Sequence, residues 1–80
     1  MTTVESLIEL IRAELRIEFD LDPATPLLSS GLVDSLNVVV LLGAIENEYG
    51  VIIDESLIAL ETFDTPEQIL QNIETAARFD

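Results

Sequence analysis

Residues 34–50 read DSLNVVVLLGAIENEYG, and the choice between helix and strand in this segment determines the fold class. Consecutive valines at positions 38–40 favour a strand, but the stretch from Leu36 to Tyr49 is long for a strand, so its length favours a helix. On a helical projection, the core-facing stripe consists of Val38, Leu41, Leu42, Ile45 and Tyr49. Asp34 suits the N-cap of this helix, and Gly50 suits the left-handed residue that ends many helices.

Two more helices are predicted, one near each end of the chain. The apolar stripe of the first is Val4, Leu7, Ile8, Ile11 and Leu15. Thr2 and Glu5 have the spacing of a capping box at its start. The last helix is predicted to begin at Thr65-Pro66-Glu67-Gln68, where a capping residue precedes a proline and a glutamine can bond back to the cap. The buried face of this helix is predicted to be Ile69, Leu70, Ile73 and Ala77.

A long loop is predicted between the first two helices, at residues 17–33, because the periodicity fails there and aspartate, proline, serine and glycine supply turn chemistry. We expect an ordered loop, pinned onto the core by Phe19, Leu21, Leu27, Leu28 and Leu32. A short helix capped by Asp54 and ending near Leu60 is expected after a brief extended segment at 51–53. The predicted fold is all-α: a small four-helix bundle, with three main helices, one short helix and a long first loop, in a single domain over residues 1–80.

Composition excludes several classes of function. The chain has 16 Asp and Glu, 3 Lys and Arg, and a formal net charge of -13, which excludes nucleic-acid binding, disfavours anionic membranes and favours basic protein partners. It has neither His nor Cys, so catalytic triads and thiolate zinc sites cannot be assembled. No metal site is expected, since Asp20-Leu21-Asp22 lacks the ligand order of a calcium loop. With no signal peptide and no membrane-spanning run, we expect a cytoplasmic monomer.

One serine stands out for its position. The segment Gly31-Leu32-Val33-Asp34-Ser35-Leu36 places Ser35 in the first turn of the central helix, directly after the long loop. A phosphate ester there would lie beside free backbone N–H groups at the positive end of the helix dipole, worth about 0.3–1 kcal/mol, although Asp34 would oppose it. An Asp-Ser pair alone more often merely begins a helix. Ser29 and Ser30 are the alternative attachment sites, because they lie near this segment.

The same segment resembles the G-x-x-D-S-L signature of acyl and peptidyl carrier proteins. The resemblance extends to chain length, the long first loop, the acidic balance, the Thr-Pro start of the last helix and the segment Glu46-Asn47-Glu48-Tyr49-Gly50-Val51. It implies that a separate phosphopantetheinyl transferase uses coenzyme A and magnesium to attach 4′-phosphopantetheine to Ser35. The thiol of this arm would carry acyl or aminoacyl groups between adenylating, acyl-transferring or condensing enzymes. The chain itself would catalyse nothing.

A second face of the central helix is a candidate surface for binding partner proteins. This face consists of Leu36, Val39, Val40, Gly43 and Asn47. Either the loop or the short helix covers it, or partners dock on it while acidic residues steer their approach, namely Asp34, Glu46, Glu48, Asp54 and Glu55.

The apolar character of this face departs from the acidic one of fatty-acid carriers. It resembles peptidyl or D-alanyl carriers, or discrete carriers of specialised, polyketide-like or nonribosomal-peptide-like pathways. A fatty-acid carrier remains an alternative. The alternative from another class is an acidic helical adaptor or nucleic-acid mimic, which should tolerate Ser35→Ala.

Overall fold

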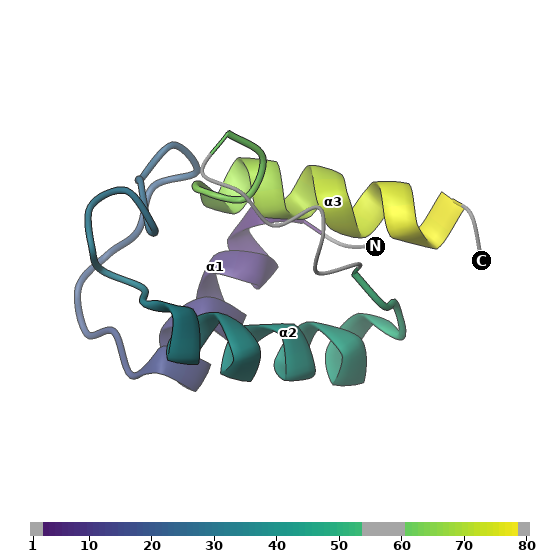
Figure 1. Cartoon of the computed structure of the whole chain (residues 1–80), viewed down its shortest axis with the longest axis horizontal. Coiled ribbons are helices and arrows are strands. Elements are labelled where there is room, and N and C mark those ends of the chain that lie inside the picture. Colours follow the sequence, from purple (N-terminus) through teal and green to yellow (C-terminus); the bar gives the residue numbers. More distant parts are fainter. Residues whose placement is uncertain (1–2, 54–60, 79–80) are drawn as a thin grey trace.

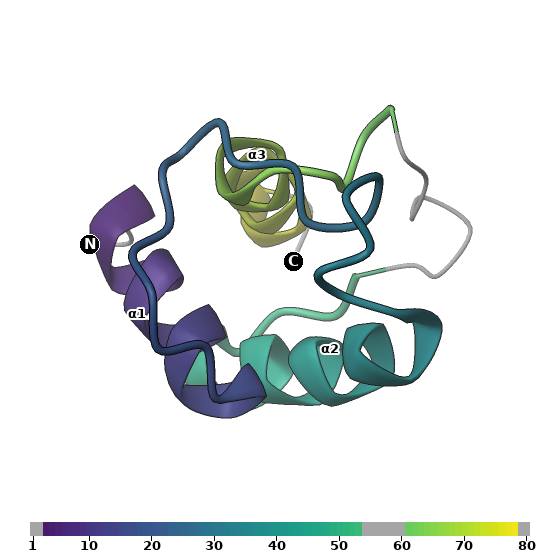
Figure 2. The same cartoon turned by 90° about the vertical axis from the view of Figure 1, so that its left-hand side faces the viewer.

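The computed structural model describes residues 3–53 and 61–78, and its regular structure within these ranges is entirely helical. Helix α1 spans Val4–Leu15, α2 spans Ser35–Tyr49 and α3 spans Pro66–Arg78. In Figure 1, α2 lies along the lower edge and α3 along the upper edge, with α1 behind them, and α1 contacts both. Figure 2 shows the three helices around a common interior. The all-α prediction is confirmed, whereas the predicted short helix from Asp54 to Leu60 lies outside the described residues.

Helix α2 has the boundaries and the buried stripe that the sequence predicts. The Asp34 carboxylate accepts a hydrogen bond from the Asn37 N–H at 2.8 Å, which satisfies one of the free donors of the first turn. At the other end, Gly50 is left-handed with φ 68°, and its N–H donates to the Glu46 carbonyl oxygen at 3.0 Å. Tyr49 is half-buried, and the buried side chains of the stripe are Val38, Leu41, Leu42 and Ile45.

The start of α1 differs from the prediction. Its N-cap is Thr3, whose hydroxyl accepts from the Ser6 N–H at 3.1 Å, while the Ser6 hydroxyl accepts from the Thr3 N–H at 3.3 Å. The predicted capping box of Thr2 and Glu5 is therefore wrong, because a serine three residues after Thr3 completes the box instead.

The start of α3 agrees with the prediction. The Thr65 hydroxyl accepts from the Gln68 N–H, and the Gln68 side-chain oxygen accepts from the Thr65 N–H, each at 3.2 Å. Ile69 and Ile73 are buried as predicted. Ala77 is exposed, contrary to the prediction, because the helix turns Ala76 toward the core instead.

The loop between α1 and α2 is ordered and packed, as predicted, with one exception. Leu21 and Leu27 are buried and Leu28 and Leu32 pack against the core, but Phe19 is 54% exposed. The Arg12 guanidinium donates to the carbonyl oxygens of residues 17 and 18 at 3.3 and 2.9 Å, and these bonds hold the chain against the end of α1. Ile17 therefore packs against the core in place of Phe19, which was predicted to do so.

The middle of the loop lies against the start of α3, as Figure 2 shows. The N–H of Glu67 donates to the Pro23 carbonyl oxygen at 3.0 Å, and the Leu27 N–H donates to the Asp64 carbonyl oxygen at 2.7 Å. The core therefore joins all three helices and the loop. Its buried members are Leu7, Ile11, Leu21, Leu27, Val33, Val38, Leu41, Leu42, Ile45, Val51, Ile53, Phe63, Ile69 and Ile73.

Candidate functional site

Ser35 is the first residue of α2, and its side chain is exposed. In the part of the chain that the structure describes, its hydroxyl makes no hydrogen bond. Asp34 takes up the Asn37 N–H, while the N–H groups of Ser35 and Leu36 precede the first intrahelical bond and have no acceptor within the helix. An exposed hydroxyl beside two free N–H donors fits a phosphate ester, since helix N-termini favour anions.

The other described serines differ from Ser35, because their hydroxyls already have partners. The Ser6 hydroxyl belongs to the capping box of α1 and donates to the Thr3 carbonyl oxygen at 2.9 Å. The Ser29 hydroxyl donates to Asp64 Oδ2 at 2.7 Å, and the Ser30 hydroxyl donates to the Pro26 carbonyl oxygen at 2.5 Å. The geometry therefore separates Ser35 from the two alternative serines of the loop.

Asp64, directly before α3, is a residue that the sequence reasoning did not single out. Its Oδ1 accepts from the N–H groups of Leu28 at 2.8 Å and Ser29 at 2.9 Å, in addition to the bond from the Ser29 hydroxyl to Oδ2. These bonds, chiefly those from the Ser29 backbone and side chain, lower the pKa of Asp64 below its ordinary value of 3.8, because they favour the ionised form. Asp64 is thus a charged tether between α3 and the loop.

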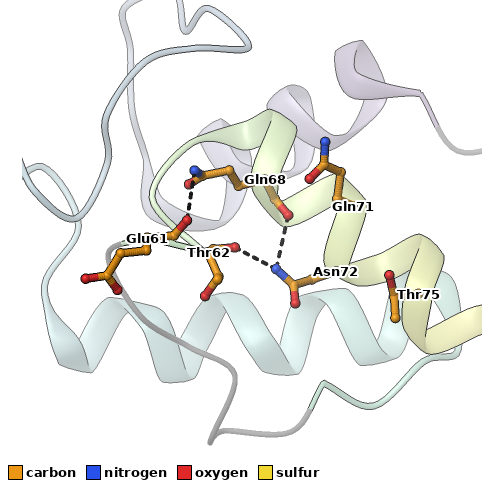
Figure 3. Close-up of a pocket in the computed structure, with 6 residues that line it drawn as sticks. All are labelled: Glu61, Thr62, Gln68, Gln71, Asn72 and Thr75. Carbon is orange, nitrogen blue, oxygen red and sulfur yellow. Dashed lines mark hydrogen bonds between the residues drawn. The ribbon is translucent and has the colours of Figure 1, made fainter.

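A polar hollow of about 250 Å³ lies beside α3 (Figure 3). Its lining residues are Glu61, Thr62, Gln68, Gln71, Asn72 and Thr75. The Gln68 amide donates to the Glu61 carbonyl oxygen at 3.2 Å, and the Asn72 amide donates to the Thr62 carbonyl oxygen at 2.7 Å. These bonds fasten the segment before α3 to the helix, which holds the neighbouring Phe63 and Asp64 in place.

A small apolar gap lies where the loop, α2 and the start of α3 meet, and it is too narrow to admit a water molecule. Its lining residues are Leu27, Leu28, Val33, Val38, Leu41, Phe63 and Ile69. Val33 and Val38, two residues before and three residues after Ser35, therefore share one packed cluster with Phe63, which directly precedes Asp64.

The predicted partner face of α2 is open to solvent. Leu36 is 72% exposed, Val39 63% and Val40 45%, so neither the loop nor any other described segment covers them. The acidic residues assigned to steering are exposed too, namely Asp34, Glu46 and Glu48. Asp54 and Glu55 lie outside the described residues.

Metal-binding clusters and membrane-spanning helices are both absent from the part of the chain that the structure describes. Among residues 3–53 and 61–78, no group of three or more carboxylates is arranged to hold a metal ion. No helix within these ranges is both long enough and apolar enough to cross a membrane.

The comparisons with known proteins agree with this geometry. The family model for the phosphopantetheine attachment site matches residues 5–73, a range that includes α2, the loop before it and most of α1 and α3. The comparison with curated proteins gave no match. Domains of this family are carriers that interact with phosphopantetheinyl transferases and biosynthetic enzymes, and their prosthetic group is covalent 4′-phosphopantetheine. The chain therefore belongs to the phosphopantetheine-attachment family of acyl and peptidyl carrier proteins.

Proposed function

We propose that Ser35 is the residue that bears 4′-phosphopantetheine, and that the chain is a non-catalytic carrier. When bound, the arm supplies a thiol on which acyl or aminoacyl groups travel as thioesters between biosynthetic enzymes. The chain itself contributes an exposed hydroxyl, a helix N-terminus that favours the phosphate, and a folded bundle that enzymes can recognise. The absence of His and Cys from the sequence supports a carrier rather than an enzyme.

The observation that carries this proposal is the exposed and unbonded hydroxyl of Ser35 within the segment GLVDSL. The test is the intact mass of the chain before and after incubation with coenzyme A, magnesium and a broad-specificity phosphopantetheinyl transferase. We expect a gain of one arm on the wild type and on Ser29→Ala, and no gain on Ser35→Ala. An unmodified wild type, or an equal gain on Ser35→Ala, would refute the proposal.

We propose further that the exposed apolar face of α2 is where partner enzymes dock. Leu36, Val39 and Val40 would be buried at the centre of such an interface, and apolar residues at the centre with charges at the rim are typical of transient complexes. The rim would include Asp34, Glu46 and Glu48, whose charges attract enzymes with a basic patch. Association should therefore slow as salt is added.

This face also supports a proposal about the pathway. Three exposed apolar side chains occupy the side of α2 where an enzyme that binds acidic side chains of its carrier would need carboxylates. We infer a carrier of peptidyl, D-alanyl or other specialised biosynthesis rather than of general fatty-acid synthesis. The test is a comparison of turnover with a fatty-acid synthase and with an adenylating enzyme of a nonribosomal pathway; ordinary turnover with the synthase would contradict the inference.

A further inference from the structure

The chain directly before Ser35 is held in place by bonds that lead back to Asp64. The Val33 N–H donates to the Leu27 carbonyl oxygen at 2.9 Å, which closes residues 27–33 into a compact turn. Val33 is buried, so this turn is also anchored in the core. Leu28 and Ser29, at the start of the turn, are the residues whose N–H groups Asp64 binds. The Asp64 carboxylate therefore fixes the turn from which Ser35 emerges two residues later.

Asp64 can act as a fixed point because it is itself held by α3. Its N–H donates to the Gln68 side-chain oxygen at 2.7 Å, and Gln68 lies in the first turn of the helix. The preceding residue, Phe63, is fully buried beside Val38 and Ile69. The carboxylate thus acts from a rigid position, and its bonds are charge-assisted, which makes them stronger than bonds between neutral groups.

Helix α2 does not need Asp64 in order to form. Its N-cap is supplied by Asp34, and its buried stripe packs on the core independently of the Asp64 carboxylate. Loss of that carboxylate would leave the Leu28 and Ser29 N–H groups without an acceptor and would loosen residues 27–33. The expected result is a folded bundle in which the segment before Ser35 is mobile.

We propose that Asp64 is a positioning residue for the modification of Ser35, because its carboxylate holds residues 27–33 in the arrangement that a phosphopantetheinyl transferase engages. This inference rests on the proposed function, in which Ser35 is the attachment site. A transferase that approaches Ser35 has to contact the adjoining turn, and a loosened turn has to be ordered when the complex forms. That cost falls on the association step, so it raises KM and leaves the chemical step largely unchanged.

The test is the kinetics of arm transfer to the full chain, with coenzyme A as the donor. For Asp64→Ala we expect kcat/KM to fall about tenfold, almost entirely through KM, with kcat within about twofold of wild type. Asp64→Asn keeps one acceptor oxygen for the two N–H groups, so it should recover most of this loss. Ser29→Ala should have a small effect alone and none in the Asp64→Ala background, because its hydroxyl acts through the same carboxylate.

Ser6→Ala is the matched control for a loss of stability alone, since it breaks the capping box of α1 and touches no residue of the turn. We expect normal transfer kinetics from this variant at a temperature where it is folded. An unchanged KM in Asp64→Ala, or the same rise in Ser6→Ala as in Asp64→Ala, would overturn the positioning role. A wild type that accepts no arm would overturn the proposed function as well, so the two failures are distinguishable.

Discussion

Truncation of Leu36 to alanine tests whether the apolar face of α2 is a docking surface. Full burial of the removed carbons would be worth about 2.4 kcal/mol, at about 0.8 kcal/mol per CH₂. Because Leu36 is 72% exposed in the free chain, a partner that covers it would gain about 1.7 kcal/mol of that energy. This corresponds to about 20-fold in affinity. The remainder, about 0.7 kcal/mol, is the expected loss of fold stability.

The assay is the steady-state transfer of the arm by a phosphopantetheinyl transferase at fixed salt. We expect Leu36→Ala to raise KM about 20-fold with kcat nearly unchanged, since uniform binding energy is lost. Ile52→Ala is the matched control, because Ile52 is 76% exposed, loses the same number of carbons and lies beyond the end of α2. Its KM should stay within about twofold of wild type.

Two results would refute this reasoning. One is a KM for Leu36→Ala that equals the wild-type value. The other is an equal rise for Ile52→Ala, which would mean that exposed apolar area in general, rather than the face of α2, governs association. Chemical denaturation of both variants accompanies the assay, since the fold should remain stable in each.

Three further predictions concern stability and are measured by chemical denaturation. Asp34→Ala should lower the free energy of unfolding by about 1 kcal/mol because it removes the N-cap of α2. Asp34→Asn should retain most of this stability, since its side-chain oxygen can still accept from the Asn37 N–H. Gly50→Ala should cost about 1–2 kcal/mol through its φ of 68° alone, since an added Cβ would meet no neighbouring atom. For Asp64, the folded-state pKa lies below the ordinary value of 3.8, so the stability that the carboxylate contributes is complete above that value and is lost as the pH falls through the folded-state pKa. The difference in unfolding free energy between wild type and Asp64→Asn should therefore be constant near neutral pH and shrink in acid; a difference that grows in acid would contradict the assignment.

Features set by neighbouring residues were predictable from the sequence. The boundaries of α2 follow from Asp34, the buried stripe and Gly50, all of which act within one helix. The Thr65 cap of α3 is likewise local. The cap of α1 is local too, but it was predicted wrongly, because the predicted box paired Thr2 with Glu5 and overlooked Ser6 as the partner of Thr3.

Features set by tertiary contacts were not predictable. Phe19 is exposed because Arg12 holds the chain beyond α1 by two bonds to backbone carbonyls, which no local hydrophobic pattern reveals. The role of Asp64 depends on partners 35 and 36 residues away. The apolar face of α2 was predictable from its spacing, but its exposure depended on where the loop packs.

The most direct test of the central claim is the location of the arm by mass spectrometry of the modified chain. Cleavage after Glu18 and Glu46 releases residues 19–46, which separates Ser35 from Ser6 and Ser56. Backbone fragmentation of this peptide then distinguishes Ser35 from Ser29 and Ser30. We predict that every fragment containing residue 35 carries the added mass and that fragments ending before it do not. The added mass on a fragment that ends at Asp34, or on a peptide outside 19–46, would contradict the account.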